Sequence, residues 1–271
     1  MQDLTTGSLT GHLLRTTSYM LVSMIFQTLY VLVDLYWVGR LGTAAVAAVG
    51  ISGNLTFIVL AATQMLGVGT TTLVAHATGR RDQARATLVF NQAQVLSTVV
   101  GIVFLVVAFL GIEPYARVFS ADDATRSLTR EYLVWFIPAM ALQFGLIAMA
   151  SALRGTGNFR PGMIVQTATV IINIVLAPVL VFGWGTGRPL GVAAAAIATL
   201  IAIAIGVVWM ALYFLPADSY LKFTPRDWTP RFQLWRDMLK IGLPAGAEFA
   251  MMAIYMMLVY AVSRPFGAAA Q

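Results

Sequence analysis

Residues 192–215 read VAAAAIATLIAIAIGVVWMALYFL, and this stretch decides the fold. It contains no charged residue and is apolar all around a helix, so it lacks both the alternation of a half-buried strand and the polar face of a surface helix. About 20 apolar residues at roughly 1.5 Å each cross the hydrocarbon core of a bilayer. Because the backbone finds no water there, it must bond to itself, as a helix does. The stretch therefore predicts a membrane-spanning helix.

Segments of similar length and polarity occur along the rest of the chain, with short polar connections between them. The first is too long for a signal peptide, and Asp34 lies where a small-residue cleavage site would be expected. The predicted fold class is an all-α integral membrane protein with spans at 13–38, 45–75, 88–112, 132–153, 163–184, 192–215 and 238–262.

The composition agrees with a lipid environment. Charged residues make up 10% of the chain and hydrophobic residues 59%, whereas a soluble domain carries roughly 25% charged residues. The net charge of +6 comes from bases spread over several connections, without a basic patch interleaved with aromatic residues, so no nucleic-acid partner is expected. The chain has no cysteine, which excludes disulfides and thiolate metal sites.

The distribution of bases predicts the orientation. If the N-terminus lies in the cytoplasm, eleven of the 17 Lys and Arg residues fall on the cytoplasmic side. Since cytoplasmic loops carry the excess of Lys and Arg, this arrangement is the preferred one. We expect a multi-pass protein of a bacterial-type cytoplasmic (inner) membrane with its N-terminus inside.

The end of the sequence indicates a repeat. Residues 264–270, RPFGAAA, follow an apolar segment as residues 39–45, GRLGTAA, do. Many transporters consist of two repeated halves. We therefore expect a six-helix N-terminal lobe at 1–215, a cytoplasmic inter-lobe linker at 216–240 and the start of a truncated C-terminal lobe at 241–271.

Two acidic residues lie within apolar spans. Asp34 and Glu248 would each cost about 2.5–3.5 kcal/mol or more at the bilayer centre, which makes them candidates for function. Asp34 is either an interfacial residue that reaches out to water or a proton or Na⁺ site, with Tyr30 one helical turn before it. Glu248 lies near the start of its span, where a carboxylate also suits the helix dipole.

Uncharged polar residues in the spans are open to two interpretations. Each can bond one helix to another, or it can serve a site. Asn173 stands out because its neighbours are all apolar and Pro178, which can kink a helix, follows it in the same span. The full set is Gln27, Asn54, Gln64, Asn91, Gln143, Gln166 and Asn173.

Five segments resemble signatures of the multidrug and toxic compound extrusion (MATE) transporters. Residues 33–42, VDLYWVGRLG, followed by AAVAAVG at 44–50, resemble the first-helix signature of that family. Residues 153–161, LRGTGNFRP, resemble its loop between helices 4 and 5. The other segments resemble helix 2 with its cytoplasmic loop, helix 5 and the start of helix 7; they are 67–82, 173–182 and 242–245.

The resemblance implies a twelve-helix fold of two six-helix lobes, of which this chain covers the first lobe and helix 7. It implies antiport: export of small amphipathic or cationic organic substrates driven by inward Na⁺ or H⁺, with no other cofactor. The bilayer and the missing C-terminal lobe of the same chain are the other expected partners, and a monomer is expected.

The same resemblance assigns roles to individual residues. Asp34 matches the helix 1 acid that serves cation coupling, and Tyr30 and Asn173 match its polar partners in some members. Gln27 and Glu248 are candidates for a substrate site or a second ion site. Ala177 stands where some members carry a second acid, which weakens the case for a two-carboxylate proton site.

The main alternative is a flippase for lipid-linked oligosaccharide precursors from the same superfamily. Such a flippase would be expected to line its cavity with more basic residues, and these spans lack them. An enzyme is not expected. The GISG sequence around Ser52 superficially resembles an intramembrane protease motif, but His12 and His76 are the only histidines, and neither is placed to act as its base.

Overall fold

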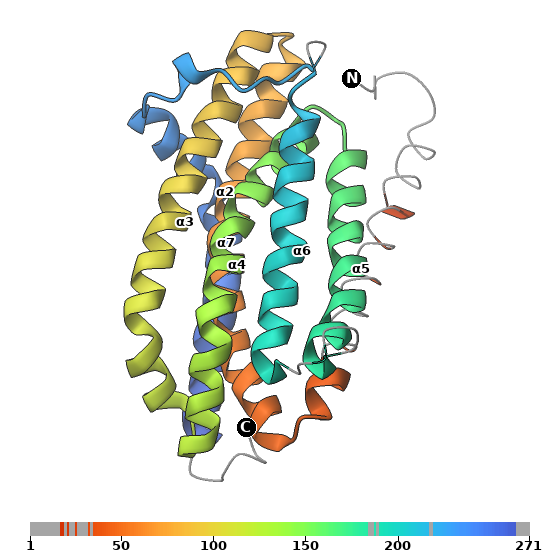
Figure 1. Cartoon of the computed structure of the whole chain (residues 1–271). Helices are drawn as coiled ribbons and strands as arrows, with labels where there is room; N and C mark the ends of the chain where they lie inside the picture. Colours follow the sequence, from red (N-terminus) through yellow and green to blue (C-terminus); the bar gives the residue numbers. More distant parts are fainter. Residues whose placement is uncertain are drawn as a thin grey trace.

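The computed structural model describes residues 17, 18, 21, 25, 32, 35–183, 187, 190–216 and 219–263. Over these residues the chain is helical, without a strand. The helices run side by side as a bundle (Figure 1). In chain order they are α2 (Thr43–Gly79), α3 (Gln83–Phe119), α4 (Asp123–Gly155), α5 (Arg160–Phe182), α6 (Gly191–Tyr213), the short 3₁₀ helix η1 (Pro225–Asp227) and α7 (Phe232–Ser263).

All six of the long helices are long and apolar enough to cross a membrane. This confirms the predicted all-α membrane fold. Most helices extend past the predicted spans by several residues; α3, for example, runs from Gln83 to Phe119 where the sequence predicts 88–112. Most of the predicted first span, 13–38, lies outside the described residues.

Side-chain caps fix the starts of two helices. The Asp82 carboxylate accepts a hydrogen bond from the Arg85 N–H at 2.9 Å at the start of α3. At the start of α4 the Asp122 carboxylate accepts from the Thr125 N–H at 2.7 Å. That bond lowers the pKa of Asp122 from its ordinary value, because it stabilises the ionised form. Each cap satisfies an N–H that the first helical turn leaves without an intrahelical partner.

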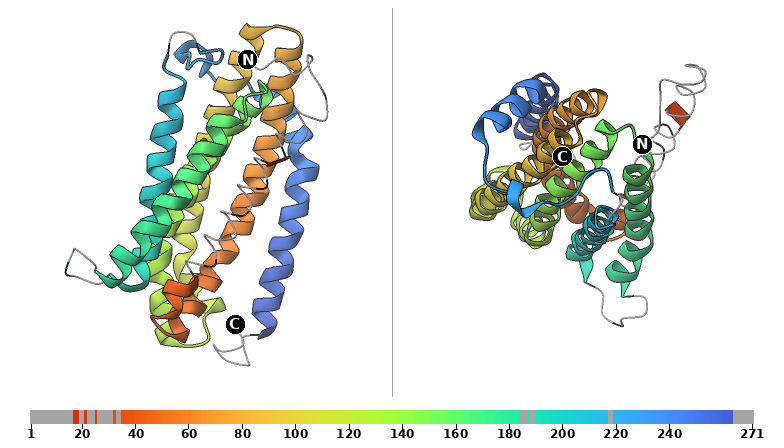
Figure 2. Two further views of the ribbon diagram at one scale, coloured as in Figure 1. Left: turned by 90° about the vertical axis from the view of Figure 1, so that its right-hand side faces the viewer. Right: turned by 90° about the horizontal axis from the view of Figure 1, so that it is seen from above.

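Helices α2 and α4 form the centre of the bundle. Helix α2 packs against α4 on one side and α7 on another, and α6 packs against both α4 and α5. In the view from above, α5 and α6 lie to one side and α7 to the other, and the connection between α6 and α7 crosses the end of the bundle (Figure 2). The largest fully buried side chains include Phe90, Phe144, Leu133 and Ile137.

Glycines let α7 approach α2 closely. A Cβ on Gly242 would collide with the backbone oxygen of Met65, and a Cβ on Gly246 would lie 2.9 Å from the backbone oxygen of Ala61. On α2 itself, a Cβ on Gly69 would collide with the backbone of Met238. Gly242 and Gly246 form a Gly-x-x-x-Gly pair on α7, the spacing that brings membrane helices into backbone contact.

Helix α3 presents an apolar surface outward. Five of its large side chains are between 52% and 79% exposed. A soluble protein would not expose so much contiguous apolar surface, and a membrane protein places such a face against lipid. The residues are Ile102, Val103, Val106, Val107 and Leu110.

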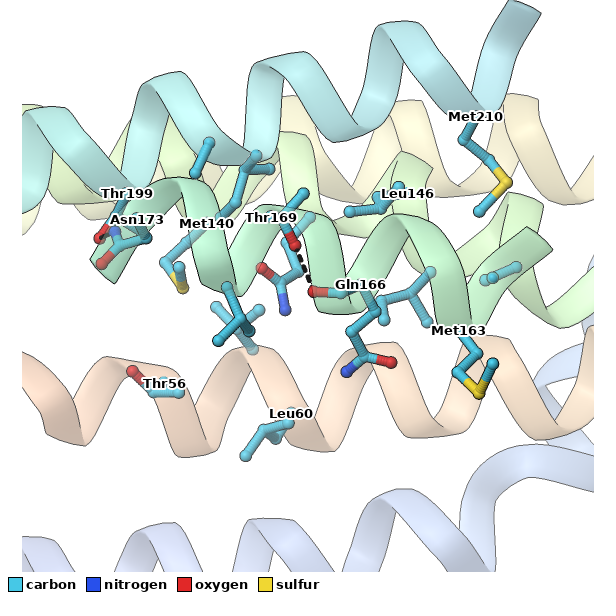
Figure 3. A pocket seen from close by; sticks show the side chains of 18 of the residues that line it. Thr56, Leu60, Met140, Leu146, Met163, Gln166, Thr169, Asn173, Thr199 and Met210 are labelled. Atoms are coloured by element: carbon cyan, nitrogen blue, oxygen red, sulfur yellow. Dashed lines mark hydrogen bonds between the residues drawn. The ribbon is translucent and has the colours of Figure 1, made fainter. Parts of the chain in front are cut away.

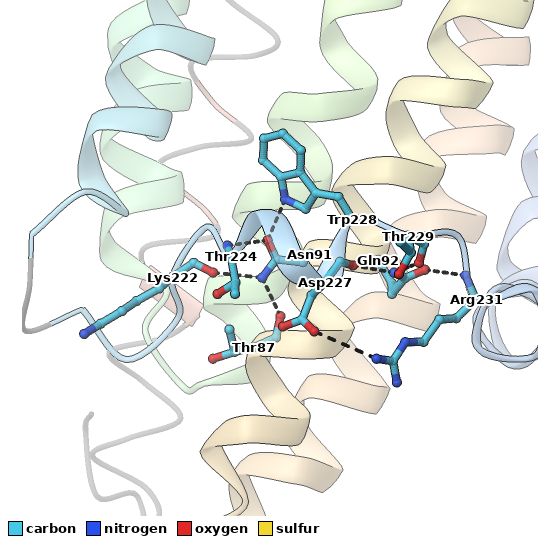
Figure 4. A network of polar contacts seen from close by, with 9 residues as sticks. All are labelled: Thr87, Asn91, Gln92, Lys222, Thr224, Asp227, Trp228, Thr229 and Arg231. Atoms are coloured by element: carbon cyan, nitrogen blue, oxygen red, sulfur yellow. Dashed lines mark hydrogen bonds and ion pairs between the residues drawn. The ribbon is translucent and has the colours of Figure 1, made fainter.

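Two adjacent amide side chains on α3 hold the connection between α6 and α7 (Figure 4). The amide nitrogen of Asn91 donates to the carbonyl oxygens of Thr87 at 2.9 Å and of Lys222 at 2.8 Å. Its amide oxygen accepts from the Thr224 N–H and from the Trp228 indole, both at 2.9 Å. Asn91 is fully buried.

Gln92 makes a second, parallel set of bonds to the same connection (Figure 4). Its nitrogen donates to the carbonyl oxygens of Asp227 at 2.6 Å and Thr229 at 2.8 Å. Its oxygen accepts from the Arg231 N–H and from the Trp235 indole, both at 2.9 Å. We call Asn91 and Gln92 the amide clamp.

Helix α7 begins at Phe232, within the segment 216–240 that the sequence assigns to a linker.

Candidate functional site

A cavity of about 630 Å³ opens between α2, α4, α5 and α6. Figure 3 shows its wall side chains projecting from these helices into a shared space. Most of the described lining is apolar, and its larger members include Phe136, Met140, Met163 and Met210. Methionine fits varied apolar shapes because its side chain is unbranched and flexible. The volume falls within the roughly 300–1,000 Å³ of small-molecule sites.

One stripe of α4 forms a wall of this cavity. Its members are three or four residues apart, so they lie one above another on the same helical face. In order along the helix they are Met140, Gln143, Ile147, Ala150 and Arg154. The stripe becomes charged only at its C-terminal end.

Asn173 joins α5 to α6 at the wall of the cavity. It is 3% exposed, and its amide nitrogen donates to the Thr199 hydroxyl oxygen at 3.0 Å. The Thr199 hydroxyl in turn donates to the Ala195 carbonyl at 3.0 Å. Figure 3 places Asn173 and Thr199 together at one end of the drawn wall. Asn173 therefore links α5 to α6 through a side-chain hydrogen bond, and it also borders the cavity.

Three other amides line the cavity without a hydrogen-bond partner among the described residues. They come from three different helices: Gln64 from α2, Gln143 from α4 and Gln166 from α5. Figure 3 shows the Gln166 side chain pointing from α5 toward α2. A side-chain amide offers two donors and an acceptor. These groups can therefore bond to a polar part of a bound molecule.

Arg154 is the one charged residue in the described lining. Its Nη2 donates to the Ser151 hydroxyl at 2.6 Å. Among the described residues no carboxylate lies within ion-pair distance of its guanidinium. The cavity thus has an apolar body, neutral amides along its walls and a positive charge at one end.

The structure tests only part of the predicted site. Asp34, Tyr30 and Gln27 lie outside the described residues. Glu248 lies on an exposed face of α7, apart from the described lining of the cavity. Across the described ranges no cluster of three or more His, Asp or Glu side chains could hold a metal ion.

Sequence reasoning noted Gln64, Gln143 and Gln166 as polar residues within spans but did not bring them together. It placed Arg154 in a connecting loop. One signal was present for two of these residues: the spacing of Gln143, Ile147, Ala150 and Arg154 places Gln143 and Arg154 on one face of a helix.

Comparison with known proteins identifies the family. The MatE family model matches residues 20–179. The chain belongs to the MatE family. This agrees with the resemblance carried by residues 33–42 and 153–161 and confirms a multi-pass membrane transporter fold.

Related sequences and structures match most of this chain and about half of their own length. It is 26% identical over 239 residues to the multidrug export protein MepA of Staphylococcus haemolyticus, covering 87% of this chain and 51% of that protein. An inward-facing structure of a multidrug resistance MATE family transporter of the MOP superfamily matches with a TM-score of 0.81 and 29% identity, covering 88% of this chain and 53% of the other. An outward-facing structure described in the same terms matches with a TM-score of 0.83 and 29% identity over 92% and 54%. The chain spans about half the length of the curated relatives it matches.

Proposed function

We propose that the full-length protein exports small amphipathic organic molecules, organic cations among them, by antiport with inward Na⁺ or H⁺. The observation that carries this proposal is the 630 Å³ cavity between membrane-spanning helices of a MatE chain, with an apolar body and side-chain amides that find no partner within the described part of the chain. The similarity to a protein named for multidrug export supports the same conclusion.

The cavity suits varied rather than single substrates. Burial of apolar surface is worth roughly 25 cal/mol per Å² and does not depend on the direction of approach, so an apolar wall binds many shapes. Met140, Met163 and Met210 add adaptable surface. Amides at Gln64 and Gln143 can turn to donate or accept, since each carries both kinds of group.

Coupling to an ion is proposed to depend on Asp34, with Tyr30 and Asn173 as polar partners. A carboxylate within the membrane can take up a proton or ligate Na⁺. Ion binding then favours one conformation only through its different affinity for the two states of the transporter. Glu248 and Gln27 remain candidates for a second ion or substrate site.

The oligosaccharide flippase alternative is not favoured. A lipid-linked pyrophosphate carries several negative charges, which need several cations to bind them. The described lining offers a single basic residue, Arg154.

The test is efflux of a fluorescent organic cation from cells expressing the full-length protein, with and without Na⁺ and with a collapsed proton gradient. Asp34→Asn is expected to abolish gradient-driven efflux, and the ion whose removal stops wild-type efflux is the coupling ion. Asp123→Asn is the matched control, because that carboxylate is 91% exposed outside the cavity. Equal efflux by wild type and Asp34→Asn would refute coupling at Asp34, and absence of cation efflux by wild type would refute the proposed function.

A further inference from the structure

A second pocket lies between the start of α5 and the end of α6, and its volume is about 440 Å³. Its lining comes from positions within 158–165 and from Trp209 and Tyr213 of α6, and we call it the edge pocket. Helices α5 and α6 stand at one edge of the bundle (Figure 2). None of the described residues lines both the edge pocket and the 630 Å³ cavity, so the two are separate sites.

The end of the bundle that carries the edge pocket is basic. Among the described residues, ten bases and three acids lie at this end, whereas the opposite end has four of each. The sequence predicts that the basic end faces the cytoplasm, and cytoplasmic leaflets contain anionic lipids. An anionic lipid headgroup is therefore the complementary partner here. The bases are Arg80, Arg81, Arg85, Arg154, Arg160, Lys222, Arg226, Arg231, Arg236 and Lys240, and the acids are Asp82, Asp227 and Asp237.

Arg160 brings one of these charges to the edge pocket. It is the first residue of α5, it is exposed, and no described carboxylate lies within ion-pair distance of it. A long side chain in a helix leans toward the helix N-terminus, which here is the membrane surface. A guanidinium can bind a phosphate group through two parallel N–H bonds. Phe159 gives the first turn of α5 no side-chain cap, so this turn also favours an anion.

Two aromatic side chains form the α6 wall of the edge pocket. Trp209 and Tyr213 lie one turn apart on the same helical face and are 45% and 41% exposed. Trp and Tyr gather where the hydrocarbon core meets the lipid headgroups. The Asn158 amide nitrogen donates to the Tyr213 hydroxyl oxygen at 3.0 Å, and an oxygen that accepts in this way can still donate its own hydrogen to a phosphate. The edge pocket thus lies at headgroup depth with polar donors available.

An apolar surface continues from the edge pocket along both helices. On α5, Ile164 lines the pocket and is 50% exposed, and Ile171 and Val175, two and three turns further along, are 46% and 62% exposed. On α6, Ile205 precedes Trp209 by one turn and is 41% exposed. An acyl chain gains free energy from covering such a surface, whereas a soluble anion does not.

We propose that the edge pocket binds the headgroup of an anionic phospholipid, such as phosphatidylglycerol. Arg160 and Tyr213 contact the phosphate, and the acyl chains lie along α5 and α6. This site goes beyond the proposed export function, because it takes a membrane lipid on the outside of the bundle and does not depend on which molecule the transporter exports.

The experiment compares two lipids with the same acyl chains. Phosphatidylglycerol carries a net negative charge, whereas phosphatidylcholine carries the same phosphate balanced by a cationic choline. The purified full-length protein in detergent is titrated with each lipid, and native mass spectrometry gives the dissociation constant of the first bound lipid. Wild type is expected to bind phosphatidylglycerol roughly fivefold or more tightly than phosphatidylcholine. Excess glycerol phosphate should leave the lipid bound, because it lacks the acyl chains.

Variants identify the groups responsible. Arg160→Gln is expected to remove the preference for phosphatidylglycerol and to leave phosphatidylcholine binding unchanged, while Arg160→Lys should keep part of the preference because it retains the charge. Tyr213→Phe should weaken both lipids alike, since both carry the phosphate. The matched control, Arg226→Gln, removes an exposed arginine at the same end that lines neither pocket, and it should keep the full preference.

Four results would overturn the proposal. They are equal affinity of wild type for the two lipids, a preference that survives in Arg160→Gln, an equal loss of preference in Arg226→Gln, and complete displacement of the lipid by glycerol phosphate. The third would mean that binding follows the total charge of this end, and the fourth that the site takes a soluble phosphate and not a lipid. Each of them leaves the proposed export function standing, because efflux of an organic cation is measured separately.

Discussion

Replacing Gln92 with methionine is expected to release the connection between α6 and α7 from α3. Methionine has a similar length and fills the same buried space, but it cannot make the four hydrogen bonds of the glutamine amide. The substitution leaves two carbonyls, one backbone N–H and one indole N–H without their partners.

The size of the effect follows from those four bonds. Each intramolecular hydrogen bond contributes about 1 kcal/mol net, so their loss costs up to about 4 kcal/mol. Asp227 is only half-buried and Thr229 and Arg231 are exposed, so water can satisfy some of the freed groups. We therefore expect local opening of this connection to become easier by about 2–4 kcal/mol. Since a factor of ten corresponds to about 1.4 kcal/mol, the opening equilibrium rises roughly 30- to 1,000-fold.

The assay is hydrogen exchange of the backbone amides in the purified full-length protein. The Arg231 amide loses its acceptor directly, whereas the Thr224 amide is held by Asn91 and reports whether the whole clamp opens. Gln94→Met is the matched control. Gln94 lies on the same helix, and its buried amide nitrogen has no hydrogen-bond partner among the residues that the structure describes. It should leave exchange in the connection unchanged and stability equal or higher. Unaltered exchange at both amides in Gln92→Met would refute the clamp.

Two further predictions concern the helices themselves. Gly246→Leu is expected to displace α7 from α2 and to lower the thermal stability of the full-length protein in detergent, because a Cβ there would already lie 2.9 Å from both the Ala61 oxygen and the Met65 Cβ. The control is Gly145→Leu, on α4 with open space around it. Equal losses of stability in the two variants would contradict the close packing of α7 on α2. Asp122→Asn is expected to destabilise the start of α4 by about 1 kcal/mol or less at neutral pH. Because the folded pKa of Asp122 is lowered, its contribution is present above the unfolded pKa and is lost as the pH falls through the folded pKa, so the stability curves of the two proteins should converge in acid. Curves that stay parallel through that range would show that the carboxylate charge contributes nothing.

The helices were predictable because their signal is local. Lipid solvation demands a long apolar run, and each run such as 192–215 can be recognised without knowledge of the rest of the chain. The ends of the helices were not predictable, because hydropathy marks the part of a helix that lies in lipid and not its whole length. The first turns of α3, from Gln83, and of α4, from Asp123, are polar and yet helical.

The amide clamp shows what a sequence pattern leaves open. For Asn91 the sequence left open a bond between helices or a place in a site, and its long-range partners are backbone and indole groups of the connection more than 130 residues later. A polar residue in an apolar span indicates that a partner exists and does not indicate which one. The same holds for Arg154: its sequence neighbours indicate a loop, and only the packing of α2 against α4 gives it a place in the cavity.

For the candidate site, too, the sequence indicated individual residues but not their partners or their orientation. Asn173 was singled out for its apolar neighbours, and it does border the cavity, although its bond to Thr199 depends on how α5 packs on α6. Glu248 was singled out because of the cost of a charge in a span, yet α7 presents it on an exposed face. The coupling roles of Asp34, Tyr30 and Asn173 stay predictions.

The central claim, that the cavity between α2, α4, α5 and α6 carries the exported molecule, is tested most directly by filling it. Gln143→Trp places an indole in the middle of the α4 stripe, while Val107→Trp adds the same bulk to a side chain that is 64% exposed on the outer face of α3. Efflux of tetramethylrhodamine methyl ester by the full-length protein is measured for both at matched expression. The account predicts at least a tenfold loss of the initial rate for Gln143→Trp and a wild-type rate for Val107→Trp, each change of tenfold being about 1.4 kcal/mol. Wild-type efflux by Gln143→Trp would contradict the account, because the exported molecule would then cross the membrane by another route.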